Sequence, residues 1–457
     1  MSDPRTALVV FTRDLRLRDH PALFHALHDS DRVVPLFVLD DAVLSGGHRS
    51  PNRVRFLLES LRDLRSSLQD LGGDLVVRRG DWVTTVVEVA EQVGADQVHL
   101  SEDVSGLART RTASLAEALA DLGASLHTHP GITVLPPGAT APSSGSDWWK
   151  VFTPYSKSWR AAPWRPIHRA PTAVPLPPGI STGALPALSD LVDSEPSPEV
   201  VPGGETEGLA RLRAWAADDL EHYDEHHDDL AGDRTSRISA YLHLGCLSPL
   251  EVATRLRDRP GGAAFVRQLC WRDFYHQVLA ARPETAHRDV RDRGDRWRHD
   301  DEDAAAWREG RTGYPIVDAA MAQLRHEGFM HNRARMVVAS FLTKDLYLDW
   351  RIGAAHFMEL LVDGDVANNQ MNWQWTAGTG TDTNPNRIFN PTVQSRRFDP
   401  DGEYLRRYLP ALRDVPAPEI HEPSPETRER TGYPAPMVDH AEAIAAYRAA
   451  LAAAKDR

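Results

Sequence analysis

The segment DGDVANNQMNWQW, residues 363–375, combines two carboxylates with several side-chain amides and two tryptophans. Buried polar groups are costly unless they are hydrogen-bonded, so a purely structural core would avoid this mixture. The segment is therefore either a wet surface loop or part of a pocket for a ligand that is both polar and flat. A calcium loop is excluded, because its sixth position is not glycine and its last position is Gln374 rather than glutamate.

Two further groups of side chains could bind a phosphate or a metal ion, but their patterns are less specific. Residues 235–239 hold three hydroxyls and Arg237, and hydroxyls, N–H groups and a fixed cation at the start of a helix can bind a phosphate. An ordinary helix cap is the alternative, and the pattern alone favours it. His222 and His226 are spaced for a metal ion, but no third ligand is indicated, so a solvated helix face is favoured.

A basic and aromatic stretch suits nucleic acid. Residues 267–299 contain eight arginines and five acids, interleaved with Trp271, Phe274, Tyr275 and Trp297, and further arginines occur at 333, 335, 396 and 397. Cations beside aromatic rings favour phosphate contact and base stacking. An arginine-rich helix paired with its own acids explains the pattern equally well. Since the chain carries a net charge of −13, a polyanionic partner needs a local basic patch.

The elements that must position these residues fall into three regions. Up to residue 130, strands predicted at 7–11, 33–39, 74–79, 96–101 and 124–129 alternate with helices predicted at 52–72, 81–94 and 107–123. This alternation predicts a Rossmann-like parallel sheet with helices on both faces. The first strand–helix turn, FTRDLRLRDH, lacks the glycines of a dinucleotide fingerprint, so we expect a ligand only at the carboxyl ends of the strands.

Residues 131–205 read as an interdomain connector, because residues 130–205 hold 15 of the 33 prolines. The aromatic segment 147–159 within it is expected to pack against a domain. From residue 206 to 457 the pattern is helical, with helices predicted at 206–223, 261–280, 314–328 and 332–348. The fold class is therefore an α/β domain (1–130), a connector (131–205) and an all-helical domain (206–457).

Composition places the protein among soluble globular chains, with 41% hydrophobic and 26% charged residues. The only cysteines, Cys246 and Cys270, have neither metal-binding nor redox spacing, which favours a reducing compartment. The first residues lack a signal peptide, and no apolar run is long enough to span a bilayer. We expect a cytoplasmic monomer that has no contact with a membrane.

Seven segments together resemble the DNA photolyase/cryptochrome family, most closely its bacterial class I cyclobutane pyrimidine dimer photolyases. The resemblance runs from Val9 to about Val415, and the segments follow one another in the order found in the family. They are FTRDLRLRDHPAL, KVFTPYSKSW, TSRISAYLHLG, LCWRDFYHQ, RTGYPIVDAAM, GFMHNRARMVVASFLTKDLYLDW and DGDVANNQMNWQW. It implies an N-terminal α/β domain that binds an antenna chromophore and a C-terminal helical domain that binds FAD.

The resemblance also assigns roles around the flavin. Arg335 and Asp363 form an ion pair beside the isoalloxazine ring, and Asn369 faces flavin N5. Trp297, Trp350 and Trp373 form a relay that photoreduces the flavin. The complete FAD-binding set implied by the family is Tyr223, Thr235, Ser236, Arg237, Ile238, Ser239, Gln268, Trp271, Arg272, Asn332, Arg335, Asp363, Asp365 and Asn369.

The implied reaction is light-driven DNA repair, a carbon–carbon lyase activity. A pyrimidine dimer flipped out of UV-damaged DNA receives an electron from light-excited reduced FAD, splits into monomers and returns the electron. Because the cofactor carries the chemistry, the protein supplies geometry. The residues at the lesion-pocket positions are Gln268, Trp271, Asn332, Arg333, Met336 and Trp375.

Two positions depart from the family pattern. Gln268 stands where cyclobutane-type enzymes commonly have glutamate. An amide can hydrogen-bond to thymine carbonyls, but it cannot supply a proton or a charge. The catalytic candidates are Gln268, Asn369 and the three relay tryptophans. His227 stands where an arginine often contacts phosphate. A weaker or pH-dependent DNA affinity is the expected consequence.

Two rival functions use the same cofactor. A cryptochrome-like blue-light sensor often adds a long signalling tail, whereas only residues 416–457 follow the matched region here. A six-four photoproduct photolyase agrees with Gln268, but the two histidines of its HHLARH signature align with Asn332 and Met336, so its proton donor is missing. Repair of cyclobutane dimers is the favoured function.

The sequence does not identify the antenna chromophore. Five residues fall where deazaflavin-type relatives line their pocket, which favours 8-hydroxy-5-deazaflavin, while methenyltetrahydrofolate or an empty pocket are the alternatives. These residues are Arg13, Phe37, Asp40, Arg53 and Asp103.

Overall fold

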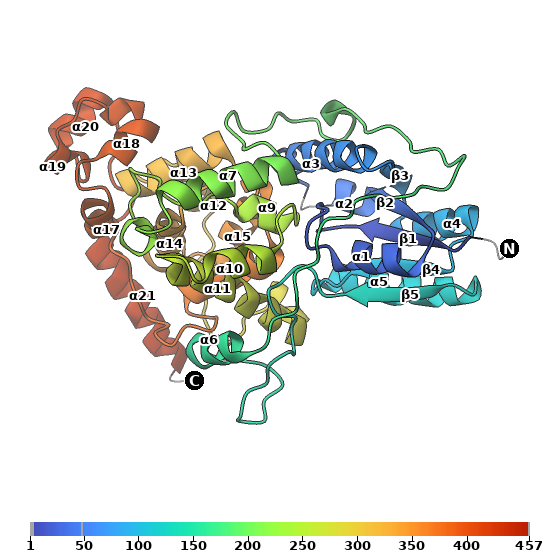
Figure 1. Ribbon diagram of the computed structural model, residues 1–457. Coiled ribbons are helices and arrows are strands. Elements are labelled where there is room, and N and C mark those ends of the chain that lie inside the picture. The colour runs from blue at the N-terminus through green and yellow to red at the C-terminus, as the bar shows by residue number, and fades with distance from the viewer. Residues whose placement is uncertain (1–3, 47–48, 456–457) are drawn as a thin grey trace. The chain divides into compact units, whose positions relative to one another are not determined.

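The computed structural model describes residues 4–46 and 49–455, and its contacts divide the chain into two compact units (Figure 1). Unit 1 holds the described residues of 1–195, 201–221 and 236–283. Unit 2 holds those of 196–200, 222–235 and 284–457. The domain boundaries predicted from the sequence, at 130 and 205, stay a proposal about the organisation of the chain.

Unit 1 is built on a parallel five-stranded sheet with the order β3-β2-β1-β4-β5. Each predicted strand is present: β1 Thr6–Phe11, β2 Arg32–Asp40, β3 Val76–Gly80, β4 Gln97–Ser101 and β5 Ser125–His129. The central strand β1 is buried along its whole length, which explains its unbroken apolar run. Since β1 pairs with β2 on one side and with β4 on the other, the strand order reverses between β1 and β4, where ligands bind in such sheets.

Helices cover both faces of this sheet, as predicted (Figure 1). One core joins Leu8 and Val10 of β1 to Val86 of α4 and Leu115 of α5. Helices α1 and α3 cover the other face, because right-handed crossovers from β1 to β2 to β3 place both there. The bounds in unit 1 are α1 Pro21–Asp29, α2 Asp41–Ser45, α3 Pro51–Gln69, α4 Trp82–Val93, α5 Gly106–Asp121, α6 Phe152–Ala161, η1 Leu188–Asp190, α7 Glu205–Asp218, α9 Ser239–His243, α10 Pro249–Leu256 and α11 Gly262–Ala281.

The loop after β1 explains why α9 to α11 belong to unit 1. The guanidinium of Arg16 is fully buried and donates to the carbonyl oxygens of Gly245 and Gly131, at 2.9 and 2.8 Å. The carboxylate of Glu205 accepts from the main-chain N–H groups of Leu17 and Arg18. The Arg16 side chain and the main chain of the FTRDLRLRDH turn therefore tie the sheet to later segments of unit 1, which periodicity could not reveal.

The connector segment 147–159 packs on unit 1, as predicted. It forms α6, which buries Phe152, Tyr155 and Trp159. The indole of Trp159 donates to Asp273 of α11 at 2.9 Å. This buried carboxylate also accepts from the main chain of residues 134 and 135, so the connector is held to α11 at several points.

Unit 2 is helical and packs around one apolar core that includes Trp307, Trp350 and Trp373. Its elements are α8 Tyr223–His226, α12 Asp301–Glu309, α13 Pro315–Glu327, α14 Asn332–Ser340, η3 Phe341–Asp345, α15 Trp350–Leu360, α16 Val366–Ala377, α17 Pro391–Phe398, α18 Glu403–Tyr408, η4 Pro410–Leu412, α19 Ala417–Ile420, α20 Pro425–Thr431 and α21 His440–Lys455; η2 Pro283–Ala286 begins at the last residue of unit 1.

The prediction of one helix over residues 332–348 is wrong in its second half. Helix α14 ends at Ser340, and η3 continues as a π-helical turn in which the N–H of Leu346 donates to the carbonyl of Phe341. Tyr347 then adopts a positive φ of 51°. Such turns often lie at functional sites. Within the described ranges, no helix is both long and apolar enough to cross a bilayer.

Candidate functional site

The opening motif of the sequence lies on α16 in unit 2. Asp365 is the N-cap of this helix, and its side chain accepts from the main-chain N–H of Asn368 at 2.8 Å. One turn further, the amide of Asn369 donates from Nδ2 to the carbonyl oxygen of Ala354 at 3.0 Å. Since a carbonyl can only accept, this bond orients the amide and leaves its oxygen as the atom available to a ligand.

The predicted ion pair of Arg335 and Asp363 is present in unit 2. The guanidinium donates to both carboxylate oxygens, at 3.1 and 2.8 Å, and also to the carbonyl of Met330. The Asp363 side chain is almost completely buried, whereas about a quarter of the Arg335 side chain is exposed. The pair is therefore held in place by the protein, with the cation at its accessible end. Its position beside a flavin stays a prediction.

Residues 235–239 do not form the helix cap that the pattern alone favoured. Helix α9 begins at Ser239, its N-cap is Ile238, and no side chain caps it. The buried Oγ1 of Thr235 has no hydrogen-bond partner among the described residues. Arg237 has a φ of 49°, a strained conformation that clusters at binding sites. A buried hydroxyl without a partner next to a strained arginine fits a phosphate-bearing ligand.

Three predicted site residues lie on α11 of unit 1 at helical spacing. Gln268 is exposed, and Trp271 is partly buried. The indole of Trp271 stacks on the ring of Phe152, with centroids 3.5 Å apart and planes 5° apart. Arg272 donates to the carbonyls of Ile132 and Leu242. The contact with Phe152, which was not foreseen, covers one face of the indole and fixes its orientation.

The predicted lesion residues of unit 2 lie on two helices. Asn332, Arg333 and Met336 occupy the first turns of α14. The guanidinium of Arg333 pairs with Asp228, from Nε at 3.1 Å, and lies 4.3 Å above the ring of Phe398. Asn332 is exposed and Met336 is half-buried.

The same unit places Trp375 near the end of α16. Arg387 lies 5.0 Å above its indole ring. Tyr223, on the short helix α8, is buried, and this burial raises the pKa of its phenol. Each of these residues is held in a defined position by unit 2, while their roles stay predictions.

The three relay tryptophans all lie in unit 2. The Trp373 ring rests on Gly353, where a Cβ would lie 2.1 Å from the ring, so only glycine leaves room for it. Gly353 is one helical turn from Trp350 on α15, which places these two indoles on the same side of the helix. Trp350 donates to Asp289 at 2.8 Å. Trp297 is partly buried and packs against the same core.

The five predicted antenna residues line one cavity of about 290 Å³ in unit 1. It opens at the carboxyl ends of β1, β2 and β4, where the strand order reverses. Its walls include the aromatic rings of Phe37 and Trp82, and its polar groups include ion pairs between Arg13 and Asp103, and between Arg111 and Asp40. Arg111, which lies on α5, was missed, because the pattern of that helix has no signature that singles it out.

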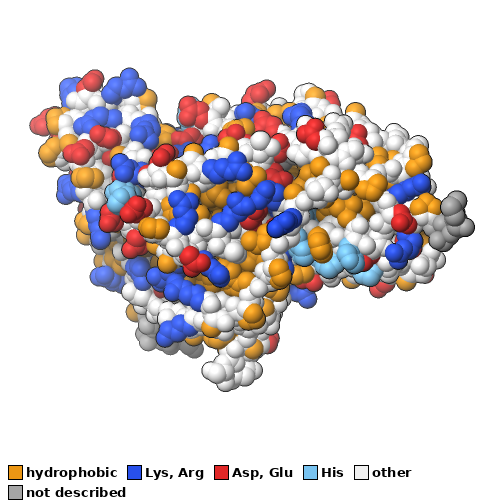
Figure 2. Space-filling view, viewed as in Figure 1, with side chains coloured by type: hydrophobic (Ala, Val, Ile, Leu, Met, Phe, Trp, Pro, Cys, Tyr) orange, Lys and Arg blue, Asp and Glu red, His pale blue; other side chains and the backbone are white. Residues whose placement is uncertain are grey.

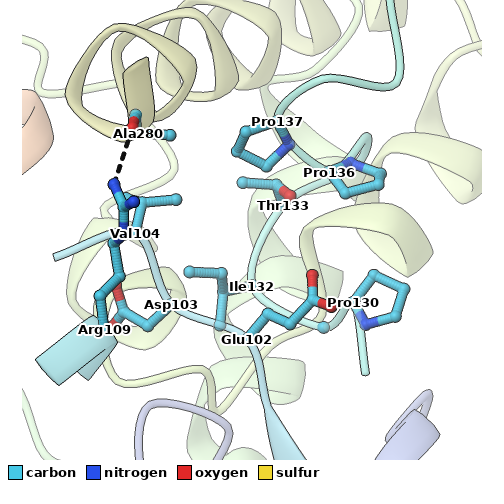
Figure 3. A pocket seen from close by; sticks show the side chains of 11 residues that line it. Glu102, Asp103, Val104, Arg109, Pro130, Ile132, Thr133, Pro136, Pro137 and Ala280 are labelled. Carbon is cyan, nitrogen blue, oxygen red and sulfur yellow. Dashed lines mark hydrogen bonds between the residues drawn. The ribbon is translucent and has the colours of Figure 1, made fainter. Parts of the chain in front are cut away.

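A second cavity of about 250 Å³ lies in the same unit (Figure 3). Pro130, Pro136, Pro137 and Ile132 form much of its wall. The guanidinium of Arg109 donates to the carbonyl oxygen of Ala280 at 2.9 Å, as Figure 3 shows. Since the Arg109 guanidinium already has a partner and the wall is mainly apolar, we assign no ligand to this cavity.

Sequence reasoning also missed a cluster of histidines in unit 1; Figure 2 shows pale-blue histidine side chains at the surface of this region, near α1. The His99 and His129 rings stack at 5.2 Å and share a hydrogen bond of 3.0 Å. His25 and His127 stack on the same pair. Burial, together with neighbouring histidines, lowers the pKa of His99 to about 4 and that of His129 to about 3. Both rings are therefore neutral at pH 7.

The possible metal site at His222 and His226 gains no further ligand from the described part of the chain. Across residues 4–46 and 49–455, no set of three or more histidine, cysteine or acidic side chains is arranged to hold a metal ion. His226 instead lies beside Arg234, at 3.2 Å.

Comparison with known proteins gives the same family throughout. Residues 7–177 match the model for DNA photolyase, and residues 265–453 match that for the FAD binding domain of DNA photolyase. A deoxyribodipyrimidine photo-lyase from Streptomyces griseus is 51% identical over 450 residues, which cover 97% of this chain and 98% of that protein.

Two solved structures extend the likeness to the fold. A class III photolyase from Agrobacterium tumefaciens has a TM-score of 0.92 at 32% identity, covering all of this chain and 99% of that one. A cryptochrome from Synechocystis has a TM-score of 0.90 at 33% identity, covering 98% of this chain and 99% of that one. The chain thus belongs to the DNA photolyase/cryptochrome family and carries its FAD-binding domain.

Proposed function

We propose that this chain is a light-driven DNA-repair enzyme that splits cyclobutane pyrimidine dimers into monomers, a carbon–carbon lyase reaction. When bound, FAD supplies the light-driven electron. The observation that carries the proposal lies in unit 2, where the ion pair of Arg335 with the buried Asp363 and the oriented amide oxygen of Asn369 follow the sequence order of the family's flavin site. The relative named deoxyribodipyrimidine photo-lyase, at 51% identity, supports it.

The residues fit FAD at its pyrophosphate and at its flavin ring. Thr235 keeps a buried hydroxyl without a partner, and the segment up to Ser239 offers further hydroxyls and the cation of Arg237, which suit the pyrophosphate. At the flavin end, Arg335 and Asp363 place a fixed charge pair, and Asn369 can accept a hydrogen bond from an N–H at N5. The remaining residues of the predicted set stay assigned to FAD.

For the dimer, we propose Trp271 and Trp375 as stacking platforms. Phe152 already covers one face of Trp271, so only the other face can take a base. Gln268, which is exposed, offers an amide to the thymine edge. The proposed set is completed by Asn332, Arg333 and Met336. The guanidinium of Arg333, which would contact the phosphate backbone, is held in place by its hydrogen bond to Asp228.

We assign Trp373, Trp350 and Trp297 to the electron relay that reduces oxidised flavin in light. Indole is among the few side chains that an excited flavin can oxidise. The direct seating of Trp373 on Gly353, one turn from Trp350, supports the first step. Partial exposure of Trp297 suits the outer end of the relay.

We infer that the cavity lined by Arg13, Phe37, Asp40, Arg53 and Asp103 binds an antenna chromophore, with 8-hydroxy-5-deazaflavin favoured. A planar ring system with a polar side chain matches aromatic walls flanked by ion pairs. Purified protein incubated with this deazaflavin should quench its fluorescence, and Trp82→Ala should weaken that binding. Stronger binding of methenyltetrahydrofolate by the same protein would assign the cavity to folate instead.

The rival functions make different predictions. A cryptochrome-like sensor, the name carried by one structural neighbour, would bind FAD and respond to light without repair. A six-four photolyase would need a histidine at the lesion, and positions 332 and 336 hold asparagine and methionine.

The deciding experiment uses chemically reduced protein with oligothymidine that contains cyclobutane dimers. Blue light should restore thymine absorbance, while the dark reaction leaves it unchanged. Binding should weaken as salt rises, because phosphate neutralisation drives it. Light-dependent flavin changes without thymine recovery would support the sensor, and recovery only from six-four photoproducts would support the other rival.

A further inference from the structure

Trp297 and Tyr347 meet where two segments of unit 2 run side by side. The N–H of Arg298 donates to the carbonyl of Tyr347 at 2.9 Å, and Arg298 pairs with Leu348 as an isolated parallel bridge. The ring centroids of Trp297 and Tyr347 are therefore held 5.2 Å apart. Rings in such direct contact can exchange an electron without an intervening group.

The backbone of Tyr347 is strained. Its φ of 51° lies in the left-handed region, which is a genuine outlier for a bulky residue. Strain of this kind persists where surrounding structure enforces it, and it clusters at functional sites. Here the π-helical turn η3 before the residue and the bridge after it hold the ring against Trp297.

The phenol of Tyr347 has a base as its partner. Its hydroxyl donates to Oδ1 of Asp295 at 3.1 Å. The Asp295 side chain is only 2% exposed, and its buried Oδ2 lies 3.7 Å from Nε of Arg293, an ion pair without a hydrogen bond. Burial raises the pKa of Asp295, so this carboxylate takes up a proton more readily than an exposed aspartate. Burial also raises the pKa of Tyr347 to about 12, which keeps the phenol protonated at neutral pH.

We propose that Tyr347 is the terminal electron donor of the tryptophan relay and that Asp295 accepts its proton; this rests on the relay proposed above. One electron passes from Tyr347 to the radical cation of Trp297, and the phenolic proton passes to the Asp295 carboxylate. Trp297 returns to its neutral closed-shell form, Tyr347 becomes a neutral phenoxyl radical, and Asp295 becomes a neutral acid. The three groups together carry the same net charge before and after the step.

The chain supplies a matched control in Tyr447. Its ring lies 5.7 Å from that of Tyr347, and both side chains are buried. Its hydroxyl, however, accepts from the guanidinium of Arg293 at 3.4 Å. Since a guanidinium cannot take up a proton, oxidation of Tyr447 has no such base. The partner of the phenol, and not the presence of an aromatic ring, therefore selects Tyr347.

The test is laser-flash absorption and electron paramagnetic resonance on protein loaded with oxidised FAD. In the parent protein, a tryptophan radical should decay as a tyrosyl radical rises, more slowly in D₂O because a proton moves. Tyr347→Phe should lose the tyrosyl signal and prolong the tryptophan radical. Asp295→Asn, which keeps the tyrosine but removes the base, should have the same effect. Tyr447→Phe should leave both signals as in the parent.

A tyrosyl signal that survives Tyr347→Phe, or disappears in Tyr447→Phe, would overturn the assignment of Tyr347. An unchanged tyrosyl rise in Asp295→Asn would overturn the role of the carboxylate. If the tryptophan radical forms but no tyrosyl radical follows in the parent, the relay stands and the terminal step fails. If no tryptophan radical forms in any of the proteins, the relay itself fails, and this inference fails with it.

Discussion

Asn369 on α16 donates from Nδ2 to the carbonyl oxygen of Ala354 on α15, at 3.0 Å. The two residues are fifteen positions apart, and their bond decides which end of the amide a ligand can meet. The sequence alone left both ends possible, since an amide can offer either an N–H or a carbonyl. The structure leaves the carbonyl oxygen.

The first prediction concerns that oxygen. Asn369→Asp replaces the bond to Ala354 by a contact between two acceptors and places a negative charge where FAD is proposed to bind. The midpoint potential of bound FAD should fall, because the added charge opposes electron uptake. Asn372→Asp is the matched control, since Asn372 is exposed on the same helix. Equal shifts in spectroelectrochemical titrations of both variants would place Asn369 away from the flavin.

Gln268 should tolerate substitution by glutamate. The side chain is exposed, so the added charge costs little stability, and both residues offer an oxygen to the pyrimidine edge. Repair yield per absorbed photon should stay equal or rise, because glutamate can also supply a proton. Complete loss of bound flavin from Gln268→Glu, measured by absorbance, would show that the residue serves the cofactor and not the lesion.

Trp271→Ala should weaken binding of dimer-containing DNA by about 1–3 kcal/mol, the usual effect of losing a stacking platform. Undamaged DNA should bind as before, since phosphate contacts remain. Trp149→Ala provides the comparison: this indole also lies in unit 1, but it donates to Thr140. Fluorescence anisotropy with both oligonucleotides measures the difference, and an unchanged affinity for damaged DNA in Trp271→Ala would remove it from the lesion site.

Trp373→Phe should block light-driven reduction of oxidised FAD while chemically reduced protein still repairs DNA. Phenylalanine still fits over Gly353 but is much harder to oxidise. Trp307→Phe is the control, because the Trp307 and Trp373 rings pack edge to face in the same core, with centroids 6.0 Å apart, while Trp307 lies outside the proposed relay. Flavin bleaching under blue light should stop only in Trp373→Phe; bleaching at the parent rate would leave Trp373 with a packing role.

The histidine cluster should make unit 1 sensitive to acid. The pKa values of His99 and His129, about 4 and about 3, lie below the value near 6.5 expected after unfolding. The unfolded chain therefore binds more protons than the folded one below pH 6.5, and stability falls as pH drops from 6.5 towards 4. Above pH 6.5 both states are neutral at these sites, and the effect disappears.

Thermal unfolding between pH 7.5 and pH 4.5 tests this expectation, the two values bracketing the ordinary histidine pKa of about 6.5. His99→Gln removes one titrating ring, so its Tm should fall less on acidification than that of the parent. His28→Gln, at an exposed position on α1, should follow the parent. Parallel curves for all three proteins would mean that other groups control acid stability.

Local patterns in the sequence determined much of this protein. Apolar runs predicted all five strands, and helical spacing predicted α3, α4 and α5 but not α1 or α2, because burial on one or both faces leaves a periodic trace in neighbouring residues. The seven motifs indicated the family because each is a continuous segment that can be recognised without knowledge of the fold. The end of α14 escaped prediction, since the π-helical turn keeps an apolar pattern while changing the hydrogen bonds.

Contacts between distant segments were decided by tertiary structure alone. Phe152 and Trp271 are far apart in sequence yet stack at 3.5 Å, and Trp297 meets Tyr347 only because an isolated bridge brings their segments together. The charge-rich loop after β1 carries no local sign that Arg16 is buried and donates to the carbonyl oxygen of Gly245. No local periodicity records such partners, because the free energy that selects them comes from desolvation and packing that exist only once the chain has folded back on itself.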